Sequence, residues 1–316
     1  MSKIFVTGAT GYIGSHVCKA LKQAGYEVVG LDRVHREHTI KHMDRFIEAD
    51  YHSAVCFDAL AYEQPDAIIH LAGTSLVGPS MADPGEYYTN NVAKTAALLD
   101  VARWLEKMPV VVFSSSAAVY GSPDVDVIYE NQPYSPMSPY GSSKAMIEIM
   151  LVDFNKAYGM KSACLRYFNA CGADLDGELG QEPGATHIIA RVLESLRDQS
   201  DQFVLNGKDF ATEDGTCVRD YIHVEDLAQA HILAIDRTVP GGVYNLGTNQ
   251  GYSNLQILHG AIGITKQDLA YTVGPRRAGD PATLTADASK FMGASGWQPR
   301  HGLEDMITHA WAWYNR

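Results

Sequence analysis

The chain has 316 residues, of which 46% are hydrophobic and 20% charged, a composition typical of a globular protein with a substantial core. Its formal net charge is −12 and it has no long run of lysine or arginine, so we expect neither nucleic acid nor an anionic membrane as a partner. The cysteines are odd in number and scattered, which argues against a disulfide framework or a metal site and predicts reduced thiols: Cys18, Cys56, Cys164, Cys171 and Cys217.

The N-terminal residues enter a strand pattern at once, and no apolar stretch reaches the ~18 residues of a membrane span, so we expect a cytoplasmic protein. Short runs rich in valine, isoleucine and phenylalanine then alternate with helical patterns. The expected strands are residues 3–8, 26–32, 45–50, 66–73, 110–116 and 161–169. The expected helices are residues 12–25, 86–107 and a run that begins near residue 140. This alternation of nearly continuously apolar strands with helices predicts an α/β protein with a Rossmann-type, doubly wound parallel sheet.

The character of the sequence changes after Asn169. Residues 170–185 are rich in glycine and acidic residues and read as a loop, and residues 208–220 read as turns. Helices at 186–198 and 222–236 and strands at 202–207 and 242–247 are expected, before a mainly helical tail from Gly251. We therefore expect residues 1–168 to form a dinucleotide-binding domain to which 218–248 return. A smaller C-terminal substrate-binding lobe would comprise residues 169–217 and 249–316.

The segment VTGATGYIG places Gly8, Gly11 and Gly14 between a strand and a helix. Glycines in this context permit a tight turn and let backbone N–H groups approach a pyrophosphate at the helix N-terminus. Asp32 ends the next strand, where a carboxylate meets the adenosine ribose. Its charge would repel a 2′-phosphate and favours NAD over NADP, although Arg33 beside it could accept that phosphate.

Two other residues at strand ends leave alternatives open. Asp50 is either an exposed acid at the end of a strand or a contact for adenine. His70 is expected to be a packed, hydrogen-bonded histidine rather than a metal ligand, and we expect no metal.

A serine-rich strand end and a tyrosine–lysine pair form the candidate catalytic set. Ser114, Ser115 and Ser116 end the fifth strand, the edge at which ligands bind in doubly wound sheets. Tyr140 and Lys144, in SPYGSSK, lie on one face at the start of a helix. Each signal alone has an ordinary structural explanation, but their order along the chain favours catalysis.

The sequence resembles the extended short-chain dehydrogenase/reductases, and specifically UDP-glucose 4-epimerases, along its whole length. The resemblance rests on TGATGYIGSH, EYYTNNVAKT, FSSSAAVYG, SPYGSSK, LRYFNACGA, TEDGTCVRDYIHVEDLA and RRAGD…ADASK. It implies tightly bound NAD, which takes hydride from C4 of a UDP-sugar and returns it to the opposite face of a 4-ketose. Tyr140 would be the general base, Lys144 would help to lower the pKa of its phenol and bind the nicotinamide ribose, and Ser116 would position the 4-hydroxyl.

The same resemblance assigns the remaining ligand contacts. For the cofactor it implies Gly8, Gly11, Tyr12, Ile13, Gly14, Asp32, Leu71, Ala72, Gly73, Asn90 and Phe168, besides Tyr140 and Lys144. For the nucleotide-sugar it implies Asn169, His187, Arg219, Arg277 and Asp280, besides Ser116. Either arginine could instead form a surface salt bridge. Family members differ in the room they leave beside the sugar C2, which a tyrosine closes in some of them. Leu284 stands at that place, so an N-acetyl group could fit, unless Leu284 only packs within the lobe.

Ser75, His187 and Asn206 depart from the family's usual residues and affect details of cofactor and nucleotide binding. A 4,6-dehydratase shares the fold but needs an acid–base pair where this chain has Ala117 and Ala118. A UDP-xylose or UDP-glucuronate 4-epimerase is the closer alternative. A non-enzymatic dinucleotide sensor would not need Ser116, Tyr140 and Lys144 together. The resemblance also implies a homodimer.

Overall fold

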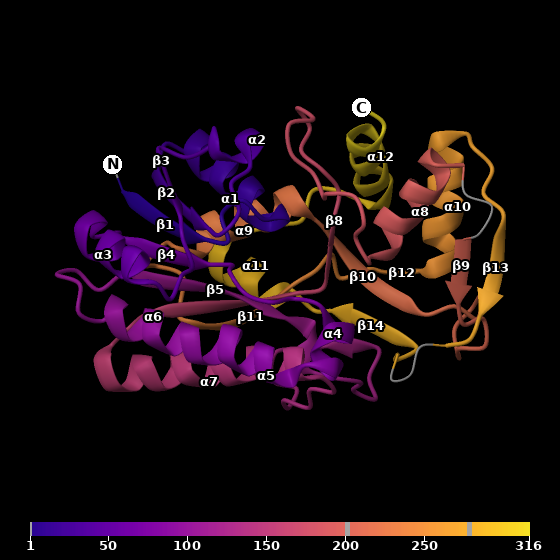
Figure 1. Cartoon of the computed structure of the whole chain (residues 1–316). Coiled ribbons are helices and arrows are strands. Elements are labelled where there is room, and N and C mark those ends of the chain that lie inside the picture. Colours follow the sequence, from indigo (N-terminus) through magenta and orange to yellow (C-terminus); the bar gives the residue numbers. More distant parts are fainter. Residues whose placement is uncertain (1, 200–202, 277–279) are drawn as a thin grey trace.

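The fold is built around a sheet of seven parallel strands (Figure 1). The structure, a computed structural model, describes residues 2–199, 203–276 and 280–316. In order across the sheet the strands are β11 (Gly242–Leu246), β7 (Ser162–Tyr167), β5 (Val110–Ser116), β4 (Ala67–His70), β1 (Lys3–Thr7), β2 (Glu27–Asp32) and β3 (Arg45–Glu48). The predicted α/β fold with a parallel sheet is confirmed.

The strand order reverses direction at β1. This strand pairs with β2 on one side and with β4 on the other, so the connections leave it toward opposite edges of the sheet. The carboxyl ends on either side of such a reversal form a crevice where ligands bind. Thr7 ends β1 beside His70 of β4, and both ring nitrogens of His70 are engaged, with Thr7 at 2.7 Å and Thr95 at 2.9 Å.

Helices cover both faces of this sheet. On one face α1 (Tyr12–Gln23) packs beside α9 (Val224–Ala234), with α11 (Ser289–Ser295) completing the apolar cluster. On the other lie α3 (Ala54–Glu63), α6 (Lys94–Ala102) and α7 (Pro139–Tyr158), the last two running along the lower side of Figure 1. Both faces of the strands are therefore buried, which explains their nearly continuous apolar sequences.

Short helices complete this part of the chain. They are α2 (Glu37–Ile40), α4 (Val77–Ala82), α5 (Pro84–Tyr87), a π-helical turn η1 (Tyr88–Ala93) that leads into α6, and a 3₁₀ turn η2 (Ala117–Val119) after β5. Among the residues that the structure describes, no helix is long and apolar enough to cross a membrane.

A second, smaller group of strands and helices lies to the right in Figure 1 and is called the smaller lobe. Its strands are β12 (Gly251–Ser253), β10 (Val218–His223), β14 (Thr283–Ala286) and β6 (Val127–Ile128), with β8 (Asn169–Cys171) paired to β10. Strands β9 (Phe203–Asn206) and β13 (Tyr271–Gly274) form a parallel pair. Helices α8 (Ile188–Arg197), α10 (Asn254–Thr265) and α12 (Leu303–Tyr314) share one apolar core.

Several elements differ from the sequence prediction, and two of them show why. Residues 54–63 form a helix that the apolar pattern did not indicate, started by Ser53, whose side chain accepts a hydrogen bond from Cys56 N at 3.2 Å. The predicted turn region 208–220 ends in β10, because Val218 and Arg219 pair with neighbours far away in sequence. Thus β10 joins the smaller sheet, while β11 pairs with β7 of the large one. The division of the chain into domains stays a prediction.

Candidate active site

A cavity of about 1250 Å³ lies at the carboxyl ends of the parallel strands and reaches into the smaller lobe. Its walls come from the β1–α1 turn, from the ends of β2, β4, β5 and β7, from the start of α7, and from α8, β9 and β10. The cavity is thus large enough for a ligand that touches both parts of the chain.

The glycine turn forms one end of the cavity. Gly8 has φ +70°, and a Cβ there would lie 2.7 Å from Ala72 N. A Cβ on Gly14 would lie 2.0 Å from Gly8 O, so the helix starts in direct contact with the turn. Gly11 caps α1 without a side-chain hydrogen bond, and Tyr12 and Ile13 follow it along the cavity wall. Because no side chain caps the helix, the first N–H groups of α1 remain available to an anion.

Asp32 is held rigidly at the end of β2. Its carboxylate accepts hydrogen bonds from the backbone N–H groups of Thr10 and Val34, both at 3.1 Å. Arg33 also lines the cavity, but 65% of its side chain is exposed. The carboxylate is therefore the more fixed of the two groups.

Asp50 does not line the cavity. Its carboxylate forms an ion pair with Lys94 at 2.6 Å and lies 3.9 Å from Arg33. The next residue, Tyr51, lines the cavity instead. A contact between Asp50 and adenine stays a prediction.

The remaining predicted cofactor residues reach the cavity from three elements. Leu71, Ala72 and Gly73 follow β4, Asn90 lies in η1, and Phe168 follows β7. The Asn90 side chain donates a hydrogen bond to the Thr74 hydroxyl at 2.8 Å, which fixes its orientation. Ser75, the residue that departs from the family pattern, also lines the cavity.

The predicted catalytic residues meet in the middle of the cavity. Helix α7 starts where the Ser138 side chain accepts a hydrogen bond from Gly141 N at 3.1 Å, with Pro139 at the first helical position. Tyr140 and Lys144 therefore occupy its first two turns and line the cavity together with Ser116, which ends β5.

Lys144 is buried and oriented by strand β5. Its Nζ donates a hydrogen bond to the Ser114 carbonyl oxygen at 2.7 Å and lies 4.8 Å from the centroid of the Phe113 ring. Burial lowers the pKa of Lys144 to about 8, because desolvation disfavours the ammonium, while the negative charge of Glu148 opposes this effect.

The pKa of Tyr140 differs from the sequence expectation. Burial of its hydroxyl raises the pKa of the phenol, and a hydrogen bond with Ser116 only partly counteracts this. The groups of the protein alone therefore do not lower the pKa as expected, since desolvation outweighs them. A further positive charge close to the phenol would favour the phenolate.

The predicted substrate residues lie at the other end of the cavity. Asn169, His187, Arg219, Asp280 and Leu284 all line it, whereas Arg277 lies outside the described residues. Asn169 donates a hydrogen bond to the Asp220 carbonyl oxygen at 2.7 Å. Leu284 pairs directly with Arg219 across strands β14 and β10.

Arg219 has an unused donor group. Its Nη1 donates to the Val218 carbonyl oxygen at 2.7 Å, and its Nη2 lies 3.5 Å from the Asp280 carboxylate. Within the described part of the chain, the buried Nη2 has no hydrogen-bond partner. An unsatisfied guanidinium nitrogen in a cavity wall fits an anionic ligand.

Sequence reasoning missed Arg191, which adds a second cationic side chain to this end of the cavity. It lies one turn into α8, after His187, the exposed residue that caps the helix. Arg191 follows His187 by four residues, so the sequence could have indicated that the two side chains lie on the same side of the helix.

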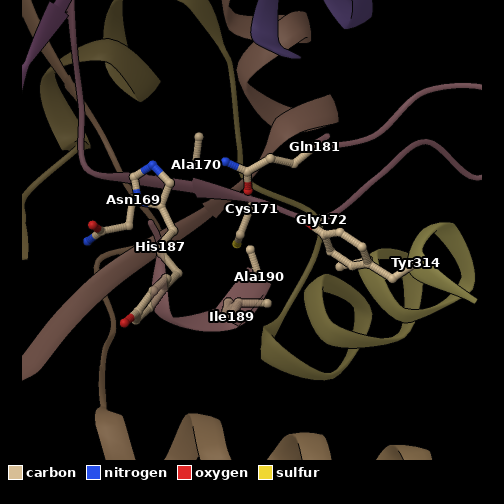
Figure 2. Close-up of a pocket in the computed structure, with 11 residues that line it drawn as sticks. Asn169, Ala170, Cys171, Gly172, Gln181, His187, Ile189, Ala190 and Tyr314 are labelled. Atoms are coloured by element: carbon tan, nitrogen blue, oxygen red, sulfur yellow. The ribbon is translucent and has the colours of Figure 1, made fainter. Parts of the chain in front are cut away.

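Beside Asn169 lies a small separate pocket of about 10 Å³, drawn in Figure 2. It shares Asn169, Ala170, Gln181, His187 and Tyr221 with the cavity wall. Its volume suits no more than about one water molecule, so we regard it as packing space next to the cavity rather than as a second site.

Residues 4–247 match the model of the NAD dependent epimerase/dehydratase family. The chain belongs to this family. It is 41% identical to a UDP-glucose 4-epimerase of Lactobacillus helveticus, over 99% of this chain and 97% of that relative. The predicted resemblance and the dependence of the family on NAD are thereby confirmed.

Solved structures agree with this assignment. The UDP-glucose 4-epimerase of Bifidobacterium longum, in complex with NAD+ and UDP, superposes with a TM-score of 0.92 at 34% identity, covering 99% of this chain and 98% of that one. The UDP-Glc/GlcNAc 4-epimerase of Campylobacter jejuni has a TM-score of 0.87 at 35% identity, covering 100% and 99%. This family member therefore shares its fold with NAD-dependent 4-epimerases over the whole chain.

Proposed function

We propose that the protein is a UDP-glucose 4-epimerase that interconverts UDP-glucose and UDP-galactose. One observation carries this proposal: the Ser116, Tyr140 and Lys144 set and the unsatisfied guanidinium of Arg219 line the same cavity. The first set suits hydride and proton transfer, and the second suits the diphosphate of a nucleotide-sugar. The relatives of the same length and fold support the same reaction.

The residues at the other end of the cavity fit NAD. The closely packed turn of Gly8, Gly11 and Gly14 leaves room for a pyrophosphate at the start of α1. The fixed Asp32 carboxylate suits the two ribose hydroxyls of NAD and would repel the 2′-phosphate of NADP. When bound, NAD supplies the hydride acceptor for C4 of the sugar and returns the same hydride to the opposite face, so no net oxidation occurs.

The catalytic residues handle the proton that accompanies this transfer. Tyr140 would take the proton from the sugar 4-hydroxyl and later return it, while the Ser116 hydroxyl positions the same oxygen. Lys144, held by the Ser114 carbonyl, places an ammonium beside the phenol and favours its ionised form. Because burial raises the pKa of Tyr140, the positive charge of the oxidised cofactor is expected to assist Lys144 in favouring the phenolate.

The substrate end of the cavity supports a nucleotide-sugar diphosphate. Arg219 and Arg191 offer guanidinium groups, which bind phosphate oxygens well even in a protein of net charge −12. Asn169 and His187 would contact the nucleotide-sugar, and the Asp280 carboxylate suits the uridine ribose. Arg277 stays a predicted second diphosphate contact.

The alternatives are less well supported. At the positions where a 4,6-dehydratase needs its acid and base, Ala117 and Ala118 line the cavity and cannot transfer protons. The relatives described above favour UDP-glucose over UDP-xylose or UDP-glucuronate as the substrate.

Leu284 supports a second substrate pair, UDP-GlcNAc and UDP-GalNAc. It lines the cavity and is partly buried against an apolar cluster that includes Phe168 and Ala286. A leucine leaves more room than a tyrosine beside the sugar C2. A structural neighbour, the UDP-Glc/GlcNAc 4-epimerase of Campylobacter jejuni, acts on both kinds of sugar by its name.

We also propose that the protein is a cytoplasmic homodimer. Helix α7 carries exposed apolar side chains at Met146, Ile149 and Val152, each more than two-fifths exposed, on the outer side of the fold. A second copy packing on this helix would cover them. The buried, free cysteines support a reducing compartment.

The direct test supplies UDP-galactose to the purified protein and couples the product to a UDP-glucose dehydrogenase, so that NADH absorbance reports epimerisation. Because the coupling dehydrogenase consumes NAD itself, cofactor retention is tested separately, by incubating UDP-galactose with the protein alone and measuring UDP-glucose by chromatography. We expect UDP-glucose to form without added NAD if the cofactor is retained, and only on added NAD if it is not. Absence of product with NAD present would refute the proposed function. Light scattering of the same preparation measures whether it is dimeric.

A further inference from the structure

A buried carboxylate lies behind the catalytic pair. Glu148 is 0% exposed and follows Lys144 by four residues on α7, so the two side chains lie on the same helical face. The proposed chemistry assigns no role to Glu148. A charge this deep in a core is costly unless it is paired and hydrogen-bonded, so its partners indicate what it does there.

The Glu148 carboxylate accepts hydrogen bonds from three other elements. Arg166 of β7 donates from Nε at 2.9 Å and from Nη2 at 2.5 Å. The Tyr134 hydroxyl donates at 2.7 Å from the loop before α7, and the Ser115 hydroxyl donates from β5. The carboxylate therefore fixes α7 to β5 and to β7, two of the strands whose ends line the cavity.

Each of these strand partners is next to a residue of the cavity. Ser115 directly precedes Ser116, and Arg166 is two residues before Phe168. Arg166 is 1% exposed and also donates to the Tyr120 hydroxyl at 2.7 Å, which in turn donates to Asn245 at 2.6 Å. The network is thus completed by hydrogen bonds and leaves little freedom for the helix to shift against the strands.

Glu148 also shapes the electrostatic surroundings of Lys144. The other groups near the ammonium are the Ser114 carbonyl and the Phe113 ring of β5, the Tyr140 ring of its own helix, and His70 of β4. His70 is neutral, because burial lowers its pKa to about 3. Among these groups, Glu148 is the one whose negative charge supports the Lys144 ammonium.

We propose that Glu148 is a positioning residue for epimerisation: its carboxylate holds the catalytic helix against β5 and β7 and keeps Lys144 in its cationic form. The inference deepens the proposed function and rests on it for the activity measurements. Removing the negative charge should lower the pKa of Lys144 further, because the effect of burial is then no longer opposed by the charge of Glu148. The ammonium would consequently be lost at a lower pH.

The test compares the NAD-bound wild type with Glu148→Gln, which keeps the shape of the side chain. In the pH profile of kcat/KM for UDP-galactose, we expect the alkaline limb to move down by about one pH unit. At a fixed pH on this limb, the variant would therefore have about tenfold lower activity than the wild type. Glu148→Asp keeps the charge but shortens the side chain, so its alkaline limb should stay in place while kcat falls. Asp153→Asn removes an exposed charge from the same helix and should leave both unchanged.

A purely structural role would give a different result. In that case Glu148→Gln would lower the melting temperature and the fraction of active enzyme, but the alkaline limb would stay where it is in the wild type. This outcome would overturn the inference. If Glu148→Gln does not fold because Arg166 is left unpaired, the double variant with Arg166→Gln removes both buried charges. The same downward shift is expected for it, since Glu148 is the group that acts on Lys144.

A second readout does not depend on turnover. The acetylation rate of Lys144 by acetic anhydride, followed by mass spectrometry across pH, reports its pKa directly in the purified protein. A lower apparent pKa in Glu148→Gln than in the wild type supports the inference, and equal values contradict it. Lack of epimerase activity in the wild type would instead refute the proposed function, and the labelling result would still decide the role of Glu148.

Discussion

The Nζ atom of Lys144 lies 5.8 Å from the centroid of the Tyr140 ring, one helical turn away on α7. The helix makes this separation nearly fixed, because side chains four residues apart lie one above the other. Strand β5 then orients the ammonium, because Lys144 Nζ donates a hydrogen bond to the Ser114 carbonyl oxygen at 2.7 Å. The pair therefore depends on both the local helix and the packing of that helix on β5.

Replacing Tyr140 by phenylalanine should abolish the proton transfer while leaving the fold intact. The variant loses only the hydroxyl, so we expect NAD to bind and turnover to fall by at least ~100-fold, the usual scale of general acid–base catalysis. The coupled assay measures turnover, and tryptophan-to-NADH energy transfer measures cofactor binding. Tyr158→Phe, the same change at an exposed position of α7, is the control. Near-normal turnover in Tyr140→Phe would mean that another group accepts the proton.

The preference for NAD should depend on Asp32. Replacing it by alanine removes the two hydrogen bonds that its carboxylate accepts and the charge that would repel a 2′-phosphate. We expect weaker NAD binding and an NAD/NADP preference reduced by about tenfold, the effect of ~1.4 kcal/mol. Calorimetric titration of both cofactors measures this, with the exposed Asp58→Ala as control. A wild type that already prefers NADP would show that Arg33, not Asp32, determines the choice.

Arg219 should hold the substrate rather than take part in the chemistry. Its buried Nη2 has an ion-pair contact with Asp280 at 3.5 Å but no hydrogen-bond partner among the described residues, so it would gain a charge-assisted hydrogen bond from a diphosphate. Arg219→Leu should therefore raise KM for UDP-galactose by roughly 10- to 150-fold, as expected for the loss of ~1.5–3 kcal/mol. NAD binding should not change. The exposed Arg300→Leu serves as control, and an unaltered KM in Arg219→Leu would place the diphosphate elsewhere.

The sequence predicted the parts of the site that depend on local order. The glycine turn, the acid at the end of β2 and the tyrosine–lysine pair each lie in a short segment whose spacing determines the geometry. Asp50 shows the limit of this reasoning, because its ion partner Lys94 is supplied by a helix 44 residues later in the chain. The spacing of Asp50 relative to its strand cannot indicate that partner.

The smaller sheet shows the same limit at the level of the fold. Strand β10 exists because β8, β12 and β14 pair with it from three separate segments, and its own sequence resembles a turn region at its start. The direction of the shift in the Tyr140 pKa also could not be predicted from the spacing of residues in the sequence. It depends on how deeply the fold buries the hydroxyl, and that burial outweighs the stabilising groups nearby.

Leu284 should determine whether N-acetyl sugars are accepted. It lines the substrate end of the cavity opposite Arg219, and a tyrosine in its place would fill the space proposed for the C2 substituent. We expect the wild type to epimerise UDP-GalNAc more slowly than UDP-galactose. Leu284→Tyr should lose N-acetyl turnover selectively, by about 10- to 200-fold in kcat/KM, the range that ~1–3 kcal/mol of pocket contacts provides.

The measurement takes kcat/KM for both substrates in the wild type, in Leu284→Tyr and in the exposed control Leu175→Tyr. If Leu284 only packs against the apolar cluster of Phe168 and Ala286, the larger tyrosine will strain that cluster and lower both activities equally. An equal loss, or no detectable N-acetyl turnover by the wild type, would contradict the role of Leu284 in specificity. A selective loss would locate the C2 substituent beside β14, because the control changes no contact of the cavity.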